Sequence, residues 1–223
     1  MLDSLFSRLA PHYCLSCGEI GAQICENCFY DIDLTARQTC LKCHGLLLSQ
    51  QCGACEPLRG VQQFVFAERH GVLERLIDEY KFSYKREARH TIARLFTQHA
   101  PYFPTFAQIV PLPTSAPHIR KRGFDHTQDI TRQFSHDRGL QHRRLLERRH
   151  NHAQVGATVL ERRQRAETAF SLQEEALDPD LLYVICDDIV TTGASMVAAT
   201  SLLRGAGARN IAVMALLQQP WKN

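Results

Sequence analysis

The hydrophobic residues of this chain follow two periods, one typical of strands and one typical of helices. Short apolar runs rich in β-branched or aromatic residues predict buried strands at 64–68, 109–113, 181–186 and 211–216. Between these runs, apolar residues at helical spacing predict helices at 72–81, at 89–100, up to Asp137 and at about 194–204. The alternation from residue 61 onward predicts an α/β fold, in which a parallel sheet carries helices on both faces.

Three segments interrupt this pattern. A basic segment at 118–126 is expected to be a loop, and 151–158 lacks periodicity and is expected to be a mobile loop. The acidic segment 170–180 is also expected to be a loop. No segment approaches the roughly eighteen apolar residues of a membrane span, and Met1 to Ala10 lacks the basic region of a signal peptide. We therefore expect a cytoplasmic protein without a membrane span.

Composition adds a second, smaller unit to this picture. A chain of 223 residues, 44% hydrophobic and 22% charged, suits one soluble α/β domain plus a small module. The formal net charge of +3 does not by itself indicate whether the chain binds nucleic acid. The cysteine-rich stretch ends at Cys55, and the residues after it include Pro57, Arg59 and Gly60, which break the pattern. We therefore expect a cysteine-rich module at 1–58 and the α/β domain at 59–223.

Eight of the nine cysteines form four CxxC pairs near the start of the chain. A CxxC turn presents two thiolates on one side of a knuckle, and two such knuckles make a tetrahedral S4 site for zinc. Disulfides are the alternative, but they are rare in a reducing compartment. The sequence thus predicts two zinc ions, held by Cys14, Cys17, Cys25, Cys28, Cys40, Cys43, Cys52 and Cys55.

The pairing of the knuckles stays open at this stage. Successive pairs sharing a zinc is the simpler arrangement, because the gaps between them are short, but an interleaved arrangement is also compatible with the sequence. A site with four cysteine ligands has no open position, so both zinc ions are expected to be structural. The ninth cysteine, Cys186, falls inside a predicted buried strand and is read as a core residue.

The stretch from Val184 to Ser195 carries the clearest chemistry. An apolar strand runs into Asp187 and Asp188, and a loop of small and hydroxyl residues follows before the next predicted helix. Hydroxyls and backbone N–H groups at the start of a helix suit a phosphate, whereas two carboxylates suit the hydroxyls of a ribose. Gly193 lets the backbone approach closely. An ordinary capped turn needs neither the two acids nor three hydroxyls.

This stretch resembles the signature of the type I phosphoribosyltransferases, which bind phosphoribosyl diphosphate (PRPP). In that family the paired acids hold the ribose hydroxyls and the loop holds the 5′-phosphate. The resemblance implies the first role for Asp187 and Asp188. It implies the second role for Thr191, Thr192, Gly193, Ala194 and Ser195.

The chain as a whole resembles the ComF family, which joins a cysteine-knuckle module to a phosphoribosyltransferase-like domain and is associated with competence and DNA utilisation. The family's motifs match here at Lys81-Phe82, Val110-Pro111, Arg122-Gly123-Phe124-Asp125-His126, Gln154, Arg162 and Ala169-Phe170. Three positions depart from the family pattern: Asp125 replaces Asn, His126 replaces Gln and Arg165 replaces Asn.

The resemblance implies that PRPP binds with magnesium and that a phosphoribosyl group passes to an acceptor. Asp187, Asp188, Lys81, Arg122 and Arg162 are then the catalytic candidates, and Lys81 and Arg120 also serve as ligands of PRPP. Magnesium and the basic side chains would neutralise charge on the departing diphosphate. For Lys81 the sequence leaves a second reading open, a cation that only favours the end of its helix.

A second function from another class also stays open. The chain could be a non-catalytic single-stranded DNA-binding protein of competence, with the PRPP site kept as a regulatory site and with DNA-processing proteins as partners. The scattered arginines would contact phosphates, and Tyr84 and Phe124 would stack on bases. A solvated basic face explains Arg143, Arg144, Arg148 and Arg149 equally well. Binding through several phosphates would show a steep dependence on salt.

Overall fold

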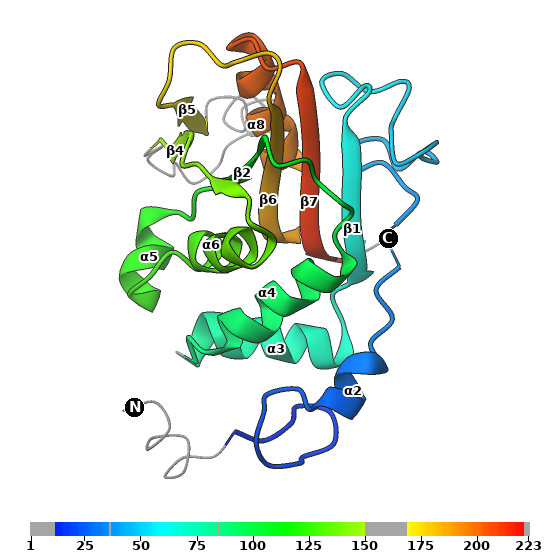
Figure 1. Cartoon of the computed structure of the whole chain (residues 1–223), viewed down its shortest axis with the longest axis vertical. Helices are drawn as coiled ribbons and strands as arrows, with labels where there is room; N and C mark the ends of the chain where they lie inside the picture. Colours follow the sequence, from blue (N-terminus) through cyan, green and yellow to red (C-terminus); the bar gives the residue numbers. More distant parts are fainter. Residues whose placement is uncertain (1–11, 36, 84, 150–168, 221–223) are drawn as a thin grey trace, which may run out of the picture.

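The computed structural model describes residues 12–35, 37–83, 85–149 and 169–220. A mostly parallel α/β arrangement follows a long irregular segment that holds the paired cysteines (Figure 1). The elements are α2 (Glu26–Tyr30), β1 (Gln62–Glu68), α3 (Gly71–Phe82), α4 (Ala88–His99), β2 (Ala107–Pro111), α5 (Ala116–Arg122), α6 (His126–Arg138), β3 (Gln141–His142), β4 (Leu146–Arg148), β5 (Phe170–Leu172), β6 (Leu182–Val190), α8 (Ala194–Gly205) and β7 (Asn210–Gln218).

The central sheet has five strands in the order β1-β7-β6-β2-β3, and every neighbouring pair is parallel. This confirms the α/β class with a parallel sheet. The chain leaves β2 toward β3 on one side and leaves β6 toward β7 on the other. The strand order therefore reverses between β2 and β6. In an open sheet a crevice forms at the carboxyl ends of such a strand pair, and ligands bind there.

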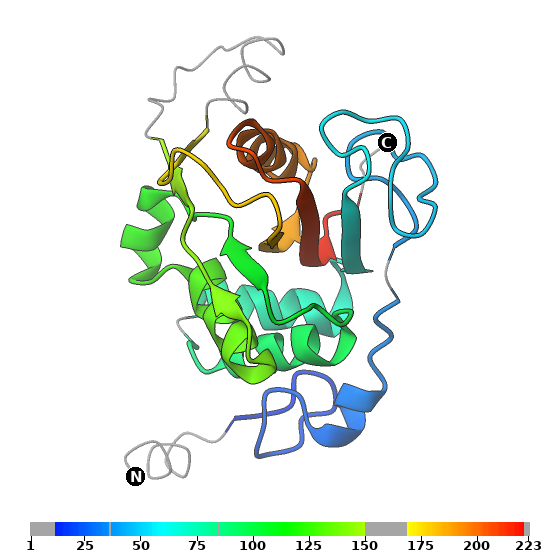
Figure 2. The same cartoon turned by 45° about the horizontal axis from the view of Figure 1, so that its top comes forward.

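Alternate residues of the strands enter two hydrophobic cores, one on each face of the sheet. Val184 and Cys186 of β6 pack with α3, α4 and α6, whereas Tyr183 and Ile185 pack with α8. This period of two is the geometry of a strand covered on both faces. Figure 2 shows the three helices below the sheet and α8 above it. Cys186 is fully buried in the first core, as its place in the strand predicted.

The cysteine-rich segment is divided between the two faces. Ile24, Phe29 and Leu34 join the core that contains α3 and α4, whereas Leu41 and Leu58 join the core that contains α8. In Figures 1 and 2 the first part of the segment lies beyond α3 and α4, and the second part lies beside β1. The two parts therefore cover opposite sides of one sheet.

Several elements differ from the sequence-based expectations. The basic segment expected to be a loop contains α5, a helix of seven residues with Pro117 in its first turn, which is too short to show a period. The segment expected to be an acidic loop begins with β5, which forms an antiparallel pair with β4. The strand that carries the two acids continues through them to Val190. Among the helices that the structure describes, none has the length and apolar character of a membrane-spanning segment.

Candidate functional site

A cleft of about 340 Å³ opens at the carboxyl ends of β2 and β6, at the point where the strand order reverses. Its size falls within the range of small-molecule sites. The lining comes from α3, the loop after β2, α5, α6, β4, β5, β6 and the start of α8, and comprises Lys81, Leu112, Pro113, Thr114, Ser115, His118, Arg122, His126, Thr127, Arg148, Phe170, Asp187, Asp188, Ile189, Thr191 and Ser195.

The two adjacent acids of β6 have different surroundings. Asp188 is almost fully buried, with its Oδ2 atom 2.5 Å from Lys81 Nζ and its Oδ1 atom 3.5 Å from His126 Nε2. Asp187 is partly exposed to the cleft, and its Oδ1 atom accepts hydrogen bonds from the Asp188 N–H at 2.9 Å and from the Thr127 hydroxyl at 3.4 Å. The sequence showed two equal carboxylates, but the fold pairs only one with a cation.

This difference separates the protonation behaviour of the pair. Burial and the charge of Asp188 raise the pKa of Asp187 well above its ordinary value. Burial also opposes ionisation of Asp188, but Lys81 and His126 outweigh it and hold the pKa of Asp188 well below its ordinary value. Asp188 is therefore the stronger acid of the pair, and Asp187 is the weaker acid.

A buried network of hydrogen bonds orients His126, which faces Asp188. Arg122 Nη1 lies 2.8 Å from Nδ1 of His126, and the arginine must donate, so the ring proton is on Nε2 and faces Asp188. The Thr114 hydroxyl donates to Asp125 at 2.8 Å, and the same carboxylate accepts from the Gln128 N–H and so caps α6. Arg122 thus lines the cleft and also orients the histidine that faces Asp188.

The loop between β6 and α8 closes one side of the cleft. Thr191 and Ser195 line the cleft, and together with Gly193 and Ala194 they also line a smaller hollow of about 40 Å³. Thr192 is exposed, and its hydroxyl accepts from the Ala194 N–H at 3.4 Å. Gly193 has a φ of 73° and precedes the first residue of α8. The start of a twelve-residue helix therefore faces this corner.

The structure brings together most, but not all, of the site residues that the sequence singled out. Lys81, Arg122, Asp187, Asp188, Thr191 and Ser195 meet at the cleft. Arg120 is exposed on α5 and does not belong to the lining. Arg162 lies outside the described residues, as do Gln154, Arg165 and the expected mobile loop at 151–158.

Sequence reasoning missed several side chains of the cleft. His118, Arg148 and Phe170 come from three separate elements, and Arg148 lies over the Phe170 ring at 5.4 Å from its centroid. Thr114 and Thr127 follow β2 and begin α6. The only feature of the sequence that indicated Thr114 is its position in the loop after a predicted buried strand. The histidine at 126 appeared in the sequence only as a departure from the ComF pattern.

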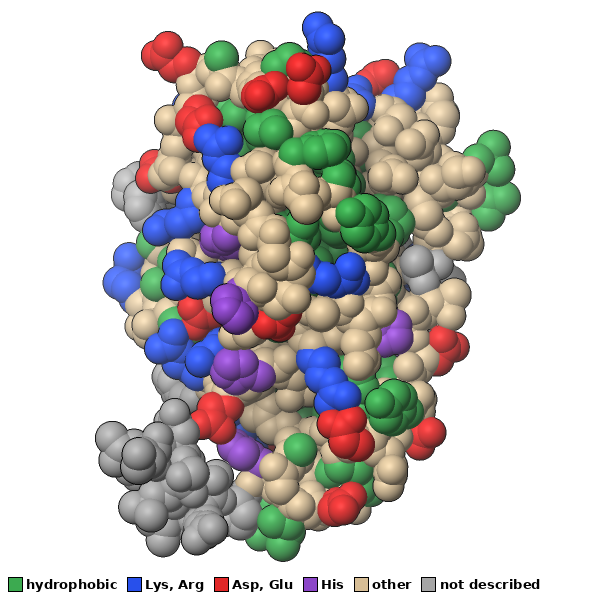
Figure 3. Space-filling view, in the orientation of Figure 1, with side chains coloured by type: hydrophobic (Ala, Val, Ile, Leu, Met, Phe, Trp, Pro, Cys, Tyr) green, Lys and Arg blue, Asp and Glu red, His purple; other side chains and the backbone are tan. Residues whose placement is uncertain are grey.

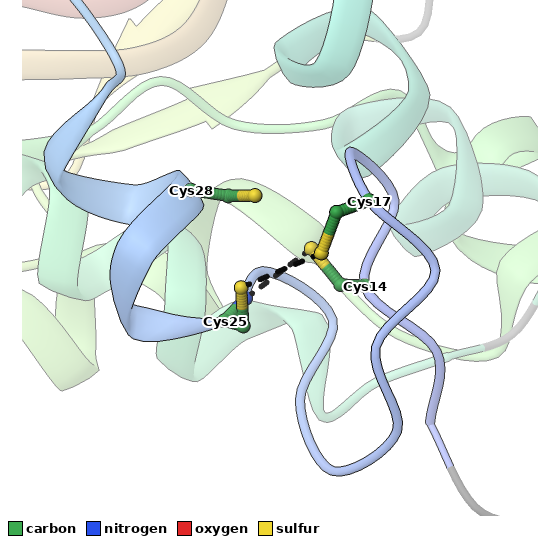
Figure 4. A group of neighbouring side chains, drawn as sticks. All are labelled: Cys14, Cys17, Cys25 and Cys28. Atoms are coloured by element: carbon green, nitrogen blue, oxygen red, sulfur yellow. Dashed lines mark hydrogen bonds between the residues drawn. The ribbon is translucent and has the colours of Figure 1, made fainter.

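The four CxxC pairs form two separate quartets, and each quartet joins successive pairs. Cys14, Cys17, Cys25 and Cys28 make the first quartet, and their sulfur atoms lie within 4.8 Å of one another (Figure 4). Cys40, Cys43, Cys52 and Cys55 make the second quartet with the same spread. The interleaved arrangement is therefore not the one adopted.

Both quartets fit a zinc ion. A tetrahedron with Zn–S bonds of about 2.3 Å has sulfur atoms about 3.8 Å apart. The Cys17 and Cys25 sulfurs are 3.7 Å apart, and those of Cys43 and Cys52 are 3.8 Å apart. Backbone N–H groups also point at the sulfurs, from Cys25 to Cys14 and from Lys42 to Cys40, both at 3.4 Å. Each quartet can hold one structural zinc.

Electrostatics within the second quartet points to the same conclusion. The neighbouring Cys43 thiol, burial and the Cys52 thiol raise the pKa of Cys55 to about 12. Burial of Cys52 acts in the same direction, but the backbone N–H groups of Ala54 and Cys55 outweigh it and lower the pKa of Cys52 to about 7. Four thiolates so close together repel one another, and a divalent cation removes that repulsion.

The cleft brings fewer potential metal ligands close together than either cysteine quartet does. Within the described part of the chain, the two cysteine quartets are the groups of three or more potential ligands. Asp187 and Asp188 contribute two carboxylates, and one of these is already paired with Lys81. Magnesium keeps several waters and is commonly held by one or two carboxylates together with substrate phosphates. The residues of the cleft fit magnesium only as a companion of a phosphorylated ligand.

Comparisons with known proteins give partial likenesses. No protein-family model matches the sequence, and no curated protein matches it. Among solved structures, the allosteric regulatory enzyme of purine biosynthesis aligns with a TM-score of 0.40 and 16% identity, over 57% of this chain and 25% of that one. A hypoxanthine phosphoribosyltransferase from Staphylococcus aureus aligns with a TM-score of 0.32 and 16% identity, over 60% of this chain and 65% of that one.

The chain thus spans a quarter of the first protein's length and just under two thirds of the second's. Both TM-scores are low, so the chemistry of the cleft has to be argued from its own residues.

Proposed function

We propose that the cleft binds PRPP together with magnesium and that the chain transfers the phosphoribosyl group to an acceptor nucleophile. The motifs shared with the ComF family favour a ComF-like protein of the cytoplasm, linked to DNA uptake or utilisation, with two structural zinc ions. The observation that carries the proposal is the juxtaposition of an acidic pair, cationic side chains and a loop suited to phosphate (residues 191–195, called the phosphate-type loop) around one cleft at the reversal point of a parallel sheet.

The parts of the cleft match the parts of PRPP. Thr191, Ser195 and the first N–H groups of α8 suit the 5′-phosphate, because hydroxyls and helix-start amides donate to phosphate oxygens. Asp187 suits the ribose hydroxyls, because a carboxylate accepts from them. Lys81 and Arg148, with His118 beside them, suit the diphosphate.

The reaction breaks the bond between C1 of the ribose and the diphosphate oxygen, whose electron pair leaves with the diphosphate. A new bond forms between C1 and the acceptor, which loses its proton. Magnesium, when bound with PRPP, would supply positive charge to the departing diphosphate. Lys81 lines the cleft and pairs with Asp188, so its ammonium is positioned to favour the same developing charge.

Ionisation of Asp187 is expected to be coupled to ligand binding. The charge of Asp188 and burial make ionisation of Asp187 less favourable in the free protein. Hydrogen bonds from two ribose hydroxyls would stabilise the ionised carboxylate of Asp187. Binding of PRPP is therefore expected to lower the pKa of Asp187.

The test is a double substitution, Asp187→Ala with Asp188→Ala, studied by calorimetric titration of PRPP with magnesium and by release of diphosphate. We expect loss of measurable binding in a variant that is less stable than the wild type but keeps its folded circular dichroism spectrum and its zinc content at the temperature of the titration. Arg120→Ala is the matched control, because its side chain lies outside the cleft lining. An affinity that the double variant leaves unchanged would refute the proposal.

A second candidate, binding of single-stranded DNA, is favoured by a basic hollow at α4 and α6. This hollow of about 470 Å³ is lined by Arg86, Arg89, Asp129, Arg132, Gln133 and His136. Lys, Arg and His side chains gather over the α5–α6 side of the molecule (Figure 3). Phe124 is buried against Tyr80 with 5.2 Å between ring centroids, so it is not available to stack on a base. Tyr84 lies outside the described residues.

The salt dependence of DNA binding tests this candidate. Arg89→Gln with Arg132→Gln should reduce the slope of log affinity against log salt by about one to two units, because each lost phosphate contact contributes about 0.7 for single strands. A wild-type protein that binds no oligonucleotide at low salt, or a double variant with an unchanged slope, would count against it.

A further inference from the structure

The first knuckle of the second cysteine quartet touches the loop between β6 and α8 (residues 191–195) through Leu41. A Cβ atom added to Gly193 would lie 2.5 Å from the carbonyl oxygen of Leu41 and 3.1 Å from the Leu41 Cβ atom. Real Cβ atoms do not approach a carbonyl so closely, so the two backbones are in contact only because residue 193 lacks a side chain. Leu41 stands between the ligands Cys40 and Cys43, within the first knuckle of its quartet.

One buried glutamine ties this knuckle to the sheet. Gln63 lies on β1 with 1% of its surface exposed. Its Oε1 atom accepts from the Leu41 N–H at 3.0 Å, and its Nε2 atom donates to the Cys40 sulfur at 3.7 Å. A single side chain therefore fixes the Leu41 backbone and also supports a metal ligand. Such hydrogen bonds to ligand atoms orient metal sites.

The same part of the chain also holds the far end of α8. Arg204, in the last turn of α8, donates to the Arg59 carbonyl at 2.5 Å and lies 3.4 Å from the Glu56 carboxylate. Lys42, in the knuckle, donates to the Glu56 carbonyl. The segment that carries the second quartet thus contacts Gly193, directly before α8, and Arg204 in the last turn of α8. Figure 2 shows this segment and α8 on the same side of the sheet.

We propose that the second quartet positions the phosphate-type loop, so that zinc at Cys40, Cys43, Cys52 and Cys55 is needed for ligand affinity at the cleft. The route runs from the metal-bound knuckle through Leu41 to Gly193, with Gln63 as the positioning residue. When zinc leaves this quartet, the knuckle loses its shape, Gly193 loses its neighbour, and residues 191–195 lose their fixed conformation. The effect on affinity rests on the proposed PRPP site, whereas the effect on the loop does not.

The first quartet provides an internal contrast. Its segment packs against α4 on the other face of the sheet, where Arg94 pairs with Glu26 at 2.5 Å and lies over the Phe29 ring at 4.1 Å from its centroid. The atoms nearest to a Cβ atom placed at Gly193 all belong to Leu41 of the second segment, and none belongs to the first segment. Zinc at the first quartet should therefore stabilise the fold without controlling the loop.

The experiment compares Gln63→Met with Gln23→Met. Methionine has a similar volume to glutamine and cannot donate or accept the hydrogen bonds of the amide. Gln23 is a buried glutamine of the first segment, and its side-chain amide has no hydrogen-bond partner among the described residues. The readouts are zinc content, amide hydrogen exchange of residues 189–196 without ligand, and the affinity for PRPP with magnesium.

For Gln63→Met we expect about tenfold faster exchange at 189–196 and about tenfold weaker PRPP binding, the scale of losing a hydrogen bond that supports a metal ligand. Gln23→Met should leave both quantities unchanged. Equal exchange at 189–196 in Gln63→Met, Gln23→Met and the wild type would overturn the inference. If the wild type binds no PRPP, the proposed function fails, but the exchange measurement still decides the role of the quartet.

A second measurement covers the case in which Gln63→Met does not fold. In the wild type, a zinc chelator is added stepwise while exchange is followed in peptides covering 12–28, 40–55 and 189–196. The inference expects 189–196 to lose protection in the same step as 40–55. Retained protection at 189–196 after 40–55 has opened, or loss of protection only when 12–28 opens, would overturn it.

Discussion

At the scale of the residue, the acidic pair of β6 shows how one strand gives two identical side chains different roles. Asp188 faces Lys81 and His126, which lower its pKa, whereas Asp187 faces the cleft and has a raised pKa. The separation comes from Lys81 of α3 and His126 of α6, which contact Asp188, whereas α6 offers Asp187 only the Thr127 hydroxyl. The pair can thus provide one fixed charge and one carboxyl whose charge responds to a ligand.

Single amide substitutions should separate these two roles. Asp188→Asn leaves buried Lys81 without its counter-charge, so we expect the free energy of unfolding to fall by about 3–5 kcal/mol. Asp187→Asn removes a carboxyl that contacts no cation and replaces it by an amide whose oxygen can accept the same hydrogen bonds, so the change should stay within about 1 kcal/mol. Urea denaturation of both variants measures this. Equal losses in the two variants would contradict the assignment of the charges.

His142 on β3 gives a prediction about pH. Burial, with the charges of Arg132 and Arg144, lowers the pKa of His142 to about 4, and its Nε2 atom lies 3.0 Å from the Thr131 hydroxyl. The unfolded chain binds a proton near pH 6.5 and the folded chain does not, so stability is complete above pH 6.5 and falls as pH drops toward 4. Because the ring is partly exposed, we expect a loss of about 1 kcal/mol between pH 6.5 and 5.

Denaturation of the wild type and His142→Gln at both pH values measures this loss. The variant should lack the His142 contribution, and His136→Gln, at an exposed position, should keep it. All three proteins carry the same cysteines, so competition between protons and zinc cancels in the comparison. A wild type and His142→Gln with the same pH dependence would contradict the burial of a neutral ring.

At the scale of the element, the loop into α8 depends on a residue without a side chain. Gly193 combines a positive φ with a contact to Leu41, whereas Gly139, which ends α6, has a φ of 64° and open space where its Cβ would be. Alanine at either position pays the strain of the left-handed conformation, about 1–3 kcal/mol. Only at position 193 does it also collide with a carbonyl.

We therefore expect Gly193→Ala to destabilise the chain more than Gly139→Ala, by at least about 1 kcal/mol, which is a typical cost of overpacking. Chemical denaturation of both variants with zinc present checks the difference. Equal losses would mean that the contact between the knuckle and the loop is not tight.

The elements themselves could largely be predicted, because their signal is periodic. The strands and long helices of the sheet lie within a few residues of their expected places, since burial on both faces imposes continuous apolar runs. The helix α5 and the pair β4–β5 could not be predicted, because seven and three residues are too few to show a period. Their positions depend on contacts made after the chain has folded.

The site could be predicted only in its local part. The two acids and the loop at 191–195 are adjacent in the sequence, so a local motif was enough to predict their chemistry. His118, Arg148 and Phe170 reach the cleft from separate elements, and the contact between Leu41 and Gly193 joins residues 152 positions apart (193 minus 41). No local pattern records such pairs, because tertiary packing alone brings them together.

At the scale of the whole molecule, the two quartets hold opposite faces of one sheet. The first joins the core beneath α3 and α4, and the second joins the core beneath α8. The irregular segments that carry them have little regular secondary structure, so metal binding is expected to supply most of their folding energy.

This arrangement predicts two zinc ions per chain, and it predicts that losing one zinc has a different effect from losing the other. Elemental analysis of the reduced protein should give two zinc ions, and Cys17→Ser and Cys43→Ser should each lower the count by one. Both variants should be less stable in thermal denaturation, but only Cys43→Ser should also weaken ligand binding at the cleft. A zinc count near zero in the freshly purified wild type would contradict the structural role.

The most direct test of the central claim, a PRPP site at the reversal point of the sheet, is calorimetric titration of the zinc-loaded wild type with PRPP and magnesium. Ribose 5-phosphate and diphosphate are titrated separately, because each fills only part of the cleft. The account predicts micromolar affinity for PRPP, weaker binding of both fragments, and competition by each. Absence of PRPP binding to a folded protein carrying two zinc ions would contradict it.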